Sequence, residues 1–217
     1  MDHQTRLGGL PRLHAAFDSL IAHPRILPFL RAFMDGPQLI NTWSISKRQG
    51  HAQGNFHAGA QPHEFSVDRS GKIHSKMLNI IRMLTDNGIN DGCVTLLPGS
   101  HKSALPVRDH LFDPDGKLVP AKDLPGAVPM LASAGSVLVM SECTLHTGLP
   151  KTTVPVRSNL YYNYMEMDSM NPMSRAPYFG YSECGKLCAF SGVSMAQSWF
   201  DFPRRLCIAC TRSSTIV

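Results

Sequence analysis

Short alternating segments separated by turn clusters dominate the chain after about residue 40, and they constrain its fold most. Each is rich in branched and aromatic residues, as β-strands are. These segments are QLINTWSISKR (38–48), KMLNIIRMLTD (76–86), CVTLLPGS (93–100), AVPMLASAGSVLVMSE (127–142) and RSNLYYNYMEM (157–167). Clusters of Gly, Asn, Asp and Pro at 68–72, 86–92, 98–103 and 113–117 separate them. The pattern predicts an antiparallel barrel or jelly roll.

The first forty residues have a different pattern, which predicts helices. Leu10, Leu13, Phe17, Leu20 and Ile21 recur at steps of one to four residues and form an amphipathic stripe. A proline at 28 suits the first turn of a second short helix, and a Gly-Pro pair at 36–37 ends the block. The predicted fold class is therefore mainly β with N-terminal helices. No internal repeat or linker divides the chain, so we expect one domain over 1–217.

Composition narrows the class of protein. The chain is 43% hydrophobic and 17% charged, which is typical of a globular domain. Its net charge of +5 is spread without any block of like charge, so it favours anionic small molecules and not nucleic acid. No apolar stretch approaches the ~18 residues of a membrane span, and the start, MDHQTRLGGL, lacks a signal-peptide core. We expect a soluble, cytoplasmic protein without a membrane partner.

Four cysteines near the C-terminus raise the question of a structural zinc site. Cys184 and Cys188 form a C-x3-C pair, and Cys207 and Cys210 form a C-x2-C pair eighteen residues later. Neither pair is followed by the Gly and basic residues usual in zinc knuckles. Free thiols are therefore the preferred interpretation, with zinc as the alternative.

Two histidines and one arginine are placed where a jelly roll binds ligands, near the mouth of the barrel. His57 follows the strand predicted around 43–48, His146 ends the segment SVLVMSECTLH, and Arg157 opens the next strand. Imidazole suits ferrous iron, and the planar guanidinium of an arginine binds both oxygens of a carboxylate. In this order the three residues predict a site for iron and a dicarboxylate such as 2-oxoglutarate. Because the chain has ten histidines, the spacing alone does not settle this.

Three segments supply a stronger signal. LTDNGINDGCVTLLPGSHKSALPV, GSVLVMSECTLHTGLP and RSNLYYNY together resemble the phytanoyl-CoA dioxygenase family, over roughly residues 15 to 165. The resemblance implies a double-stranded β-helix, non-haem Fe(II), 2-oxoglutarate and O2. It implies that His57 and His146 bind the metal and that Arg157 binds the cosubstrate. Asn79 falls on a strand whose inward residues touch the cosubstrate in this family.

The chain departs from the family pattern in three places. Gly59 stands where the family's His-x-Asp motif has its carboxylate ligand. The N-terminus is shorter than expected by some tens of residues, and the chain after about residue 170 is atypical.

The glycine leaves three interpretations open. An iron- and 2-oxoglutarate-dependent halogenase would bind chloride in the vacated position. Alternatively, a carboxylate from elsewhere substitutes, with Glu64 and Asp68 within reach of His57. Glu142 lies four strand residues before His146, about 13 Å away if the strand is straight, so we expect it to shape the pocket instead. The third interpretation is a non-catalytic jelly-roll binding protein that has lost iron.

Taken together, the sequence predicts a 2-oxoglutarate-dependent dioxygenase that hydroxylates a small organic substrate. Halogenation and a non-catalytic binding role are the alternatives. The parity of RSNLYYNY places Tyr161 and Asn163 on the side of Arg157, inside the barrel, and Tyr162 and Tyr164 on the other face.

Overall fold

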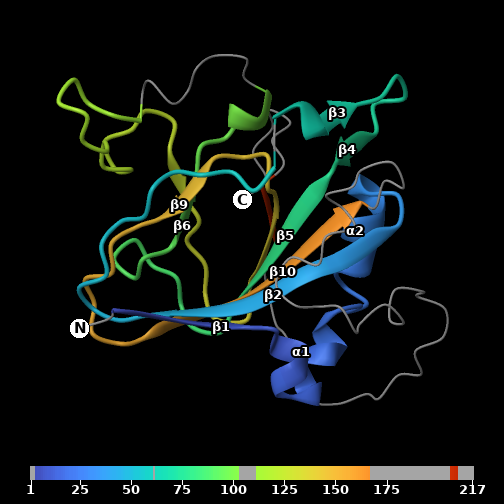
Figure 1. Cartoon of the computed structure of the whole chain (residues 1–217), viewed down its shortest axis with the longest axis horizontal. Helices are drawn as coiled ribbons and strands as arrows, with labels where there is room; N and C mark the ends of the chain where they lie inside the picture. The colour runs from blue at the N-terminus through green and yellow to red at the C-terminus, as the bar shows by residue number, and fades with distance from the viewer. Residues whose placement is uncertain (1–2, 61, 103–110, 167–205, 210–217) are drawn as a thin grey trace.

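The computed structural model describes residues 3–60, 62–102, 111–166 and 206–209. Figure 1 shows a twisted sheet with short helices against one face and a smaller sheet opposite. The N-terminal elements are β1 Gln4–Gly8, α1 Leu10–Leu13, the 3-10 helix η1 Ala15–Leu20, α2 Leu27–Phe33 and β2 Pro37–Lys47. The central elements are η2 Pro62–Glu64, β3 Phe65–Val67, β4 Ile73–Ser75, β5 Met77–Met83, β6 Val94–Leu96 and η3 Ser100–Lys102. The remaining strands are β7 Val128–Pro129, β8 Val137–Ser141, β9 His146–Gly148, β10 Arg157–Glu166 and β11 Leu206–Ala209.

The strands form three sheets. The largest has the order β1-β2-β10-β5-β8-β11, a second has the order β7-β6-β9, and β3 pairs with β4. All pairs are antiparallel except β11 with β8. Neighbours in the large sheet are far apart in sequence, as expected where a jelly roll interleaves its strands. The mainly β architecture with N-terminal helices is confirmed.

Both faces of the large sheet are covered, which explains why β5 is buried along its whole length. Alternate residues of β5 pack to opposite sides. Ile81 faces the small sheet, in a cluster with residues of β6, β8 and β10. Ile80 faces the N-terminal helices, in a cluster that contains Leu20, Leu30 and Tyr162.

The N-terminal helices are also fixed to the sheet by hydrogen bonds. The hydroxyl groups of Tyr162 and Tyr164 donate to the carbonyls of Phe17 and Ile21, at 3.0 and 2.6 Å. Both tyrosines therefore lie on the helix side of β10, as their parity predicts.

Two sequence predictions about the elements are wrong. Residues 4–8, expected within a helical block, form β1 and extend the sheet beside β2. The segment that ends at His146 is not one strand, because β8 ends at Ser141, the chain turns, and His146 opens β9 in the other sheet. The predicted Pro28 helix and the five strands from 38 onward are confirmed.

Some predictions fall outside the described residues. These include the atypical segment after about residue 170, apart from the backbone of β11, and the zinc or free-thiol question for the four C-terminal cysteines. That the chain forms one domain stays a prediction. Within the described residues, no helix is long and apolar enough to cross a membrane.

Candidate metal and cosubstrate site

The two predicted metal ligands lie side by side. His57 and His146 form an isolated antiparallel bridge, with both backbone amides donating to the opposite carbonyl at 3.0 and 2.9 Å. Their ring centroids are 4.3 Å apart. Two imidazoles bound to one metal at about 2.1 Å and at right angles have centroids roughly 4.5 Å apart. The spacing of the rings therefore fits a shared metal ion.

Each ring is held by its own loop. Nδ1 of His57 bonds the carbonyl of Asn55 at 3.0 Å, and Nδ1 of His146 bonds the carbonyl of Thr144 at 2.9 Å. A carbonyl acceptor requires the proton on Nδ1, which leaves Nε2 as the free donor atom for a metal. Burial lowers the pKa of His146, and the neighbouring His57 lowers it further against the raising effect of Glu142. Both features favour the neutral imidazole that binds metals.

An acidic side chain approaches this pair from the turn between β8 and β9. The carboxylate oxygen Oε2 of Glu142 lies 3.9 Å from Nε2 of His146, and the residue is buried. The other oxygen, Oε1, accepts a hydrogen bond of 2.6 Å from the side-chain amide of Asn79. The separation of about 13 Å expected for a straight strand does not apply, because the chain bends at 142–144 instead of continuing as a strand.

Asn79, expected at the cosubstrate, is buried on β5 and contacts Glu142. Among the described residues, its own Oδ1 has no hydrogen-bond partner, and neither has Oδ1 of Asn163, which lies opposite Asn79 on β10. Buried polar atoms of this kind normally have partners. The two amides therefore form a buried polar strip inside the barrel, beside Glu142.

The predicted cosubstrate arginine lies deeper in the barrel. Arg157 is buried. Its Nη2 donates to the carbonyl of Gly92 at 2.7 Å, and its Nη1 donates to the hydroxyl of Tyr161 at 3.3 Å. Its Nε has no hydrogen-bond partner among the described residues. Tyr161 in turn stacks on Trp43 at a centroid distance of 5.6 Å. Tyr161 thus lies on the inner face with Arg157, as its parity predicts.

A second buried cation accompanies Arg157. Lys47 is paired with it in register across β2 and β10, and only 6% of Lys47 is exposed. Among the described residues, no ion pair joins either cation to an acid. Burial and then the charge of Arg157 lower the pKa of Lys47 to about 8. The nearby Cys93 does not compensate, because burial raises the pKa of its thiol to about 11.

The histidine pair and the cation pair lie along one strand face. His146 and Gly148 are two residues apart on β9, so they face the same side. A Cβ built on Gly148 would overlap with Nζ of Lys47, so the lysine lies directly against that face. Two strand residues span about 7 Å, which suits the two ends of a five-carbon dicarboxylate.

Of the two alternative carboxylates, Asp68 is engaged elsewhere. It accepts hydrogen bonds from Ser70 and Lys72 in the turn between β3 and β4, and it pairs with His74. Glu64 ends the 3-10 helix η2, directly before β3. As the structure stands, no three His, Cys, Asp or Glu side chains of the described residues are arranged to hold a metal.

Residues 5–158 match the phytanoyl-CoA dioxygenase family. The chain belongs to this family. The sequence-based prediction of the family is therefore confirmed, over slightly more of the chain than expected.

A curated dioxygenase also resembles part of the chain. Dioxygenase lolE1 from Epichloe uncinata is 28% identical over 127 residues, which cover 57% of this chain and 46% of that protein. The chain thus spans less than half the length of this curated relative.

Two solved structures confirm the jelly-roll fold. HygX from Streptomyces hygroscopicus, with nickel and 2-oxoglutarate bound, is 18% identical with a TM-score of 0.67, over 80% of this chain and 77% of its own. HygX has also been solved with hygromycin B bound. The α-ketoglutarate-dependent epimerase SnoN from nogalamycin biosynthesis is 18% identical with a TM-score of 0.56, over 82% of this chain and 68% of its own.

Sequence reasoning missed Lys47 and misplaced Glu142. Lys47 could have been found from the pairing of the two strands. Residues directly opposite each other on neighbouring strands face the same side, and Lys47 lies opposite Arg157. Nothing in the sequence indicated the bend that brings Glu142 to His146.

Proposed function

We propose that this chain is an Fe(II)- and 2-oxoglutarate-dependent oxygenase in which His57 and His146 bind the metal. Arg157 and Lys47 would bind the distal carboxylate of 2-oxoglutarate. The observation that carries the proposal is the placement of two buried cations, with no acidic partner among the described residues, about two strand residues from a histidine pair. Burying a charge without a partner is costly, so such a pair is expected where an anion binds.

The residues of the chain would orient the reactants. The carbonyls of Asn55 and Thr144 fix the tautomers of the two histidines. Gly148 leaves room for the ammonium of Lys47 beside β9. The Arg157 guanidinium is itself oriented by the Gly92 carbonyl and the Tyr161 hydroxyl. When bound, iron and 2-oxoglutarate would supply the activation of O2.

Hydroxylation of a small organic substrate is the reaction we propose first. A small-molecule substrate is supported by the HygX structure with hygromycin B. The similarity to an epimerase illustrates that proteins of this fold catalyse other reactions as well. The reaction must therefore be measured on this protein. Halogenation is the alternative that the glycine at position 59 keeps open.

The first test is an anaerobic titration with Fe(II) and 2-oxoglutarate, followed through the visible charge-transfer band of the chelate. We expect a band that Arg157→Ala weakens by raising the 2-oxoglutarate Kd roughly 10- to 100-fold, because a charge-assisted contact is lost. Arg31→Ala, at an exposed position of α2, is the matched control and should leave the Kd unchanged. Absence of a band in folded wild-type protein would refute the proposal, and a band that shifts with chloride would favour halogenation.

A further inference from the structure

The space facing Gly59 is already filled by a side chain of this protein. A Cβ built on Gly59 would overlap with Oε2 of Glu142 and would lie 3.1 Å from its Cδ and 3.4 Å from its Cβ. The contact with Oε2 is one that real Cβ atoms essentially never show, so the carboxylate would have to move. A side chain at position 59 and the present position of the Glu142 carboxylate are therefore mutually exclusive.

The backbone fixes this arrangement from both sides. The amides of Gly59 and Ala60 both donate to the carbonyl of Glu142, at 2.9 and 3.2 Å, and the amide of Glu142 donates to Met77 on β5 at 3.0 Å. The turn closes through the amide of Thr144, which donates to the carbonyl of Ser141 at 3.0 Å. The backbone of Glu142 is thus held between the segment after His57 and Met77, the first residue of β5.

The carboxylate of Glu142 has an unusual environment for a buried acid. Its side chain is 5% exposed, and among the described residues no lysine or arginine pairs with it. Asn79 binds Oε1, which leaves Oε2 facing Nε2 of His146 at 3.9 Å. Buried carboxylates are normally paired with a cation or coordinate a metal. The group nearest to Oε2 is Nε2 of His146, so a metal ion bound to that nitrogen would place a cation beside the carboxylate.

We propose that Glu142 is the third protein ligand of the metal and takes the place of the carboxylate that the chain lacks at position 59. This inference rests on the proposed function, since it needs a metal on His57 and His146. The ligands would then be two histidines and one carboxylate, the usual set for non-haem iron, with the carboxylate supplied by the turn before His146. A rotation of the Glu142 side chain, with its hydrogen bond to Asn79 kept, would bring its Oε2 to the metal that His57 and His146 bind. The position open to a halide would be occupied, so the site would be that of an oxygenase.

The test is a titration of the metal-free protein with Co(II) alone, followed through its visible d–d absorption. We expect Glu142→Gln to weaken Co(II) binding at least tenfold, because a charged ligand becomes a neutral amide of the same shape. Glu166→Gln removes one negative charge at the end of β10, outside the site, and should leave the Kd unchanged. Equal Kd values for wild-type and Glu142→Gln proteins would overturn the proposal.

A relocation variant distinguishes a ligand from a residue that only positions His146. In the double variant Gly59→Asp with Glu142→Ala, the shortened side chain at 142 clears the space that a residue at 59 needs, and a carboxylate returns at position 59 beside His57. We expect Co(II) affinity to recover to within a few-fold of wild type. No recovery beyond the affinity of Glu142→Ala alone would mean that Glu142 acts only through His146, and this would also overturn the proposal. Should Glu142→Gln fail to fold, Glu142→Ala removes the carboxylate without leaving a buried amide, and unchanged Co(II) affinity in that variant would refute the proposal.

Failure of this inference differs from failure of the proposed function. If wild-type protein binds no Co(II), and His146→Ala changes nothing, the histidine pair is not a metal site and both proposals fail. If wild-type protein binds Co(II) and loses it in His146→Ala but not in Glu142→Gln, only the role of Glu142 fails. Chloride that tightens Co(II) binding to wild-type protein would show the position to be open and would likewise overturn it.

Discussion

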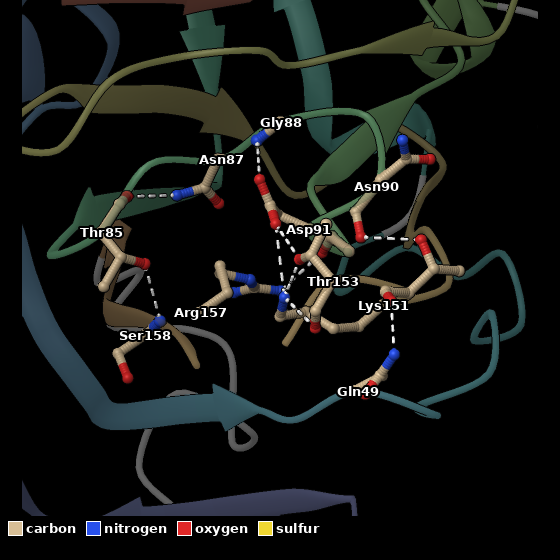
Figure 2. A network of polar contacts seen from close by, with 12 residues as sticks. Gln49, Thr85, Asn87, Gly88, Asn90, Asp91, Lys151, Thr153, Arg157 and Ser158 are labelled. Atoms are coloured by element: carbon tan, nitrogen blue, oxygen red, sulfur yellow. Dashed lines mark hydrogen bonds and ion pairs between the residues drawn. The ribbon is translucent and has the colours of Figure 1, made fainter. Parts of the chain in front are cut away.

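Two buried lysines, Lys47 and Lys151, lie in neighbouring parts of the barrel and have opposite environments. Lys151, only 1% exposed, is paired with Asp91 at 3.3 Å and donates to the carbonyl of Thr153 at 2.8 Å. Thr153 also contacts both charged groups through its hydroxyl, so the network closes on itself, as Figure 2 shows. Lys47 is almost as buried, yet no hydrogen bond or ion pair joins its ammonium to a described residue.

Under the proposed function, the difference separates a lysine that stabilises the fold from one that binds the cosubstrate. The Lys151 network joins the loop after β5 to the segment before β10, and its groups satisfy one another. Lys47 and Arg157 instead have no acidic partner among the described residues, which costs stability. If the proposed function holds, the same two charges bind the cosubstrate. Stability should therefore depend on the first cluster and cosubstrate binding on the second.

The largest expected effect on stability is at Asp91. Asp91→Asn leaves the fully buried ammonium of Lys151 without its counter-charge, and we expect a loss of about 3 kcal/mol in the free energy of unfolding. Denaturant unfolding at pH 7 measures it. The affinity for 2-oxoglutarate should stay within about twofold of wild type if the variant is folded; a large loss of affinity with unchanged stability would reverse the assignment of the two clusters.

The same variant has a signature on the acid side. The hydrogen bond from Thr153, the amide of Gly88 and the charge of Lys151 hold the pKa of Asp91 below its usual value near 3.8. A depressed folded pKa contributes stability that is present above the unfolded pKa and is lost as the pH falls through the folded pKa. Wild-type stability should therefore fall more steeply below about pH 4 than that of Asp91→Asn.

At Lys47 we expect the converse behaviour. Lys47→Met keeps the volume of the side chain and removes its charge, so it should raise the 2-oxoglutarate Kd roughly 10-fold or more. The free energy of unfolding should not fall, because an unpaired buried charge is removed. Anaerobic band titration and denaturant unfolding on the same protein measure the two effects. Lys122→Met, on a side chain that is 77% exposed, is the control for loss of one charge. Destabilisation by Lys47→Met without loss of affinity would make Lys47 a structural residue.

The smallest expected effect is a pH dependence of cosubstrate binding. Because the pKa of Lys47 is lowered to about 8, its ammonium loses the proton as the pH rises through that value. The 2-oxoglutarate Kd of wild-type protein should rise by up to about tenfold between pH 7 and pH 9. Lys47→Met should show a flat profile over that range. An equal rise in both proteins would assign the titration to another group.

The sequence was sufficient for the residues whose roles depend on local pattern. His57, His146 and Arg157 could be predicted because the family motifs keep their spacing, and the structure brings the two histidines together. The inward side of β10 followed from strict alternation, which placed Tyr161 with Arg157 and Tyr162 with the helices. Their roles in binding stay predictions.

The rest depended on contacts between segments distant in sequence. β1 was missed because QTRLG is too short and polar to indicate a strand, and its pairing with β2 decides its conformation. The placement of Glu142 required a bend that is set by hydrogen bonds from Gly59 and Ala60, more than eighty residues earlier. Neither contact can be predicted from the local sequence pattern.

The shared volume at positions 59 and 142 has a consequence for how such chains can diverge. Since only one of the two residues can place atoms there, a glutamate at 142 tolerates glycine at 59, and an aspartate at 59 requires another residue or rotamer at 142. The two positions should covary among relatives, with an acid at one or the other and rarely at both. A transition between the two arrangements would pass through an intermediate with a weakened metal site or a crowded one. Because such an intermediate would function poorly, a lineage that has one arrangement would tend to keep it.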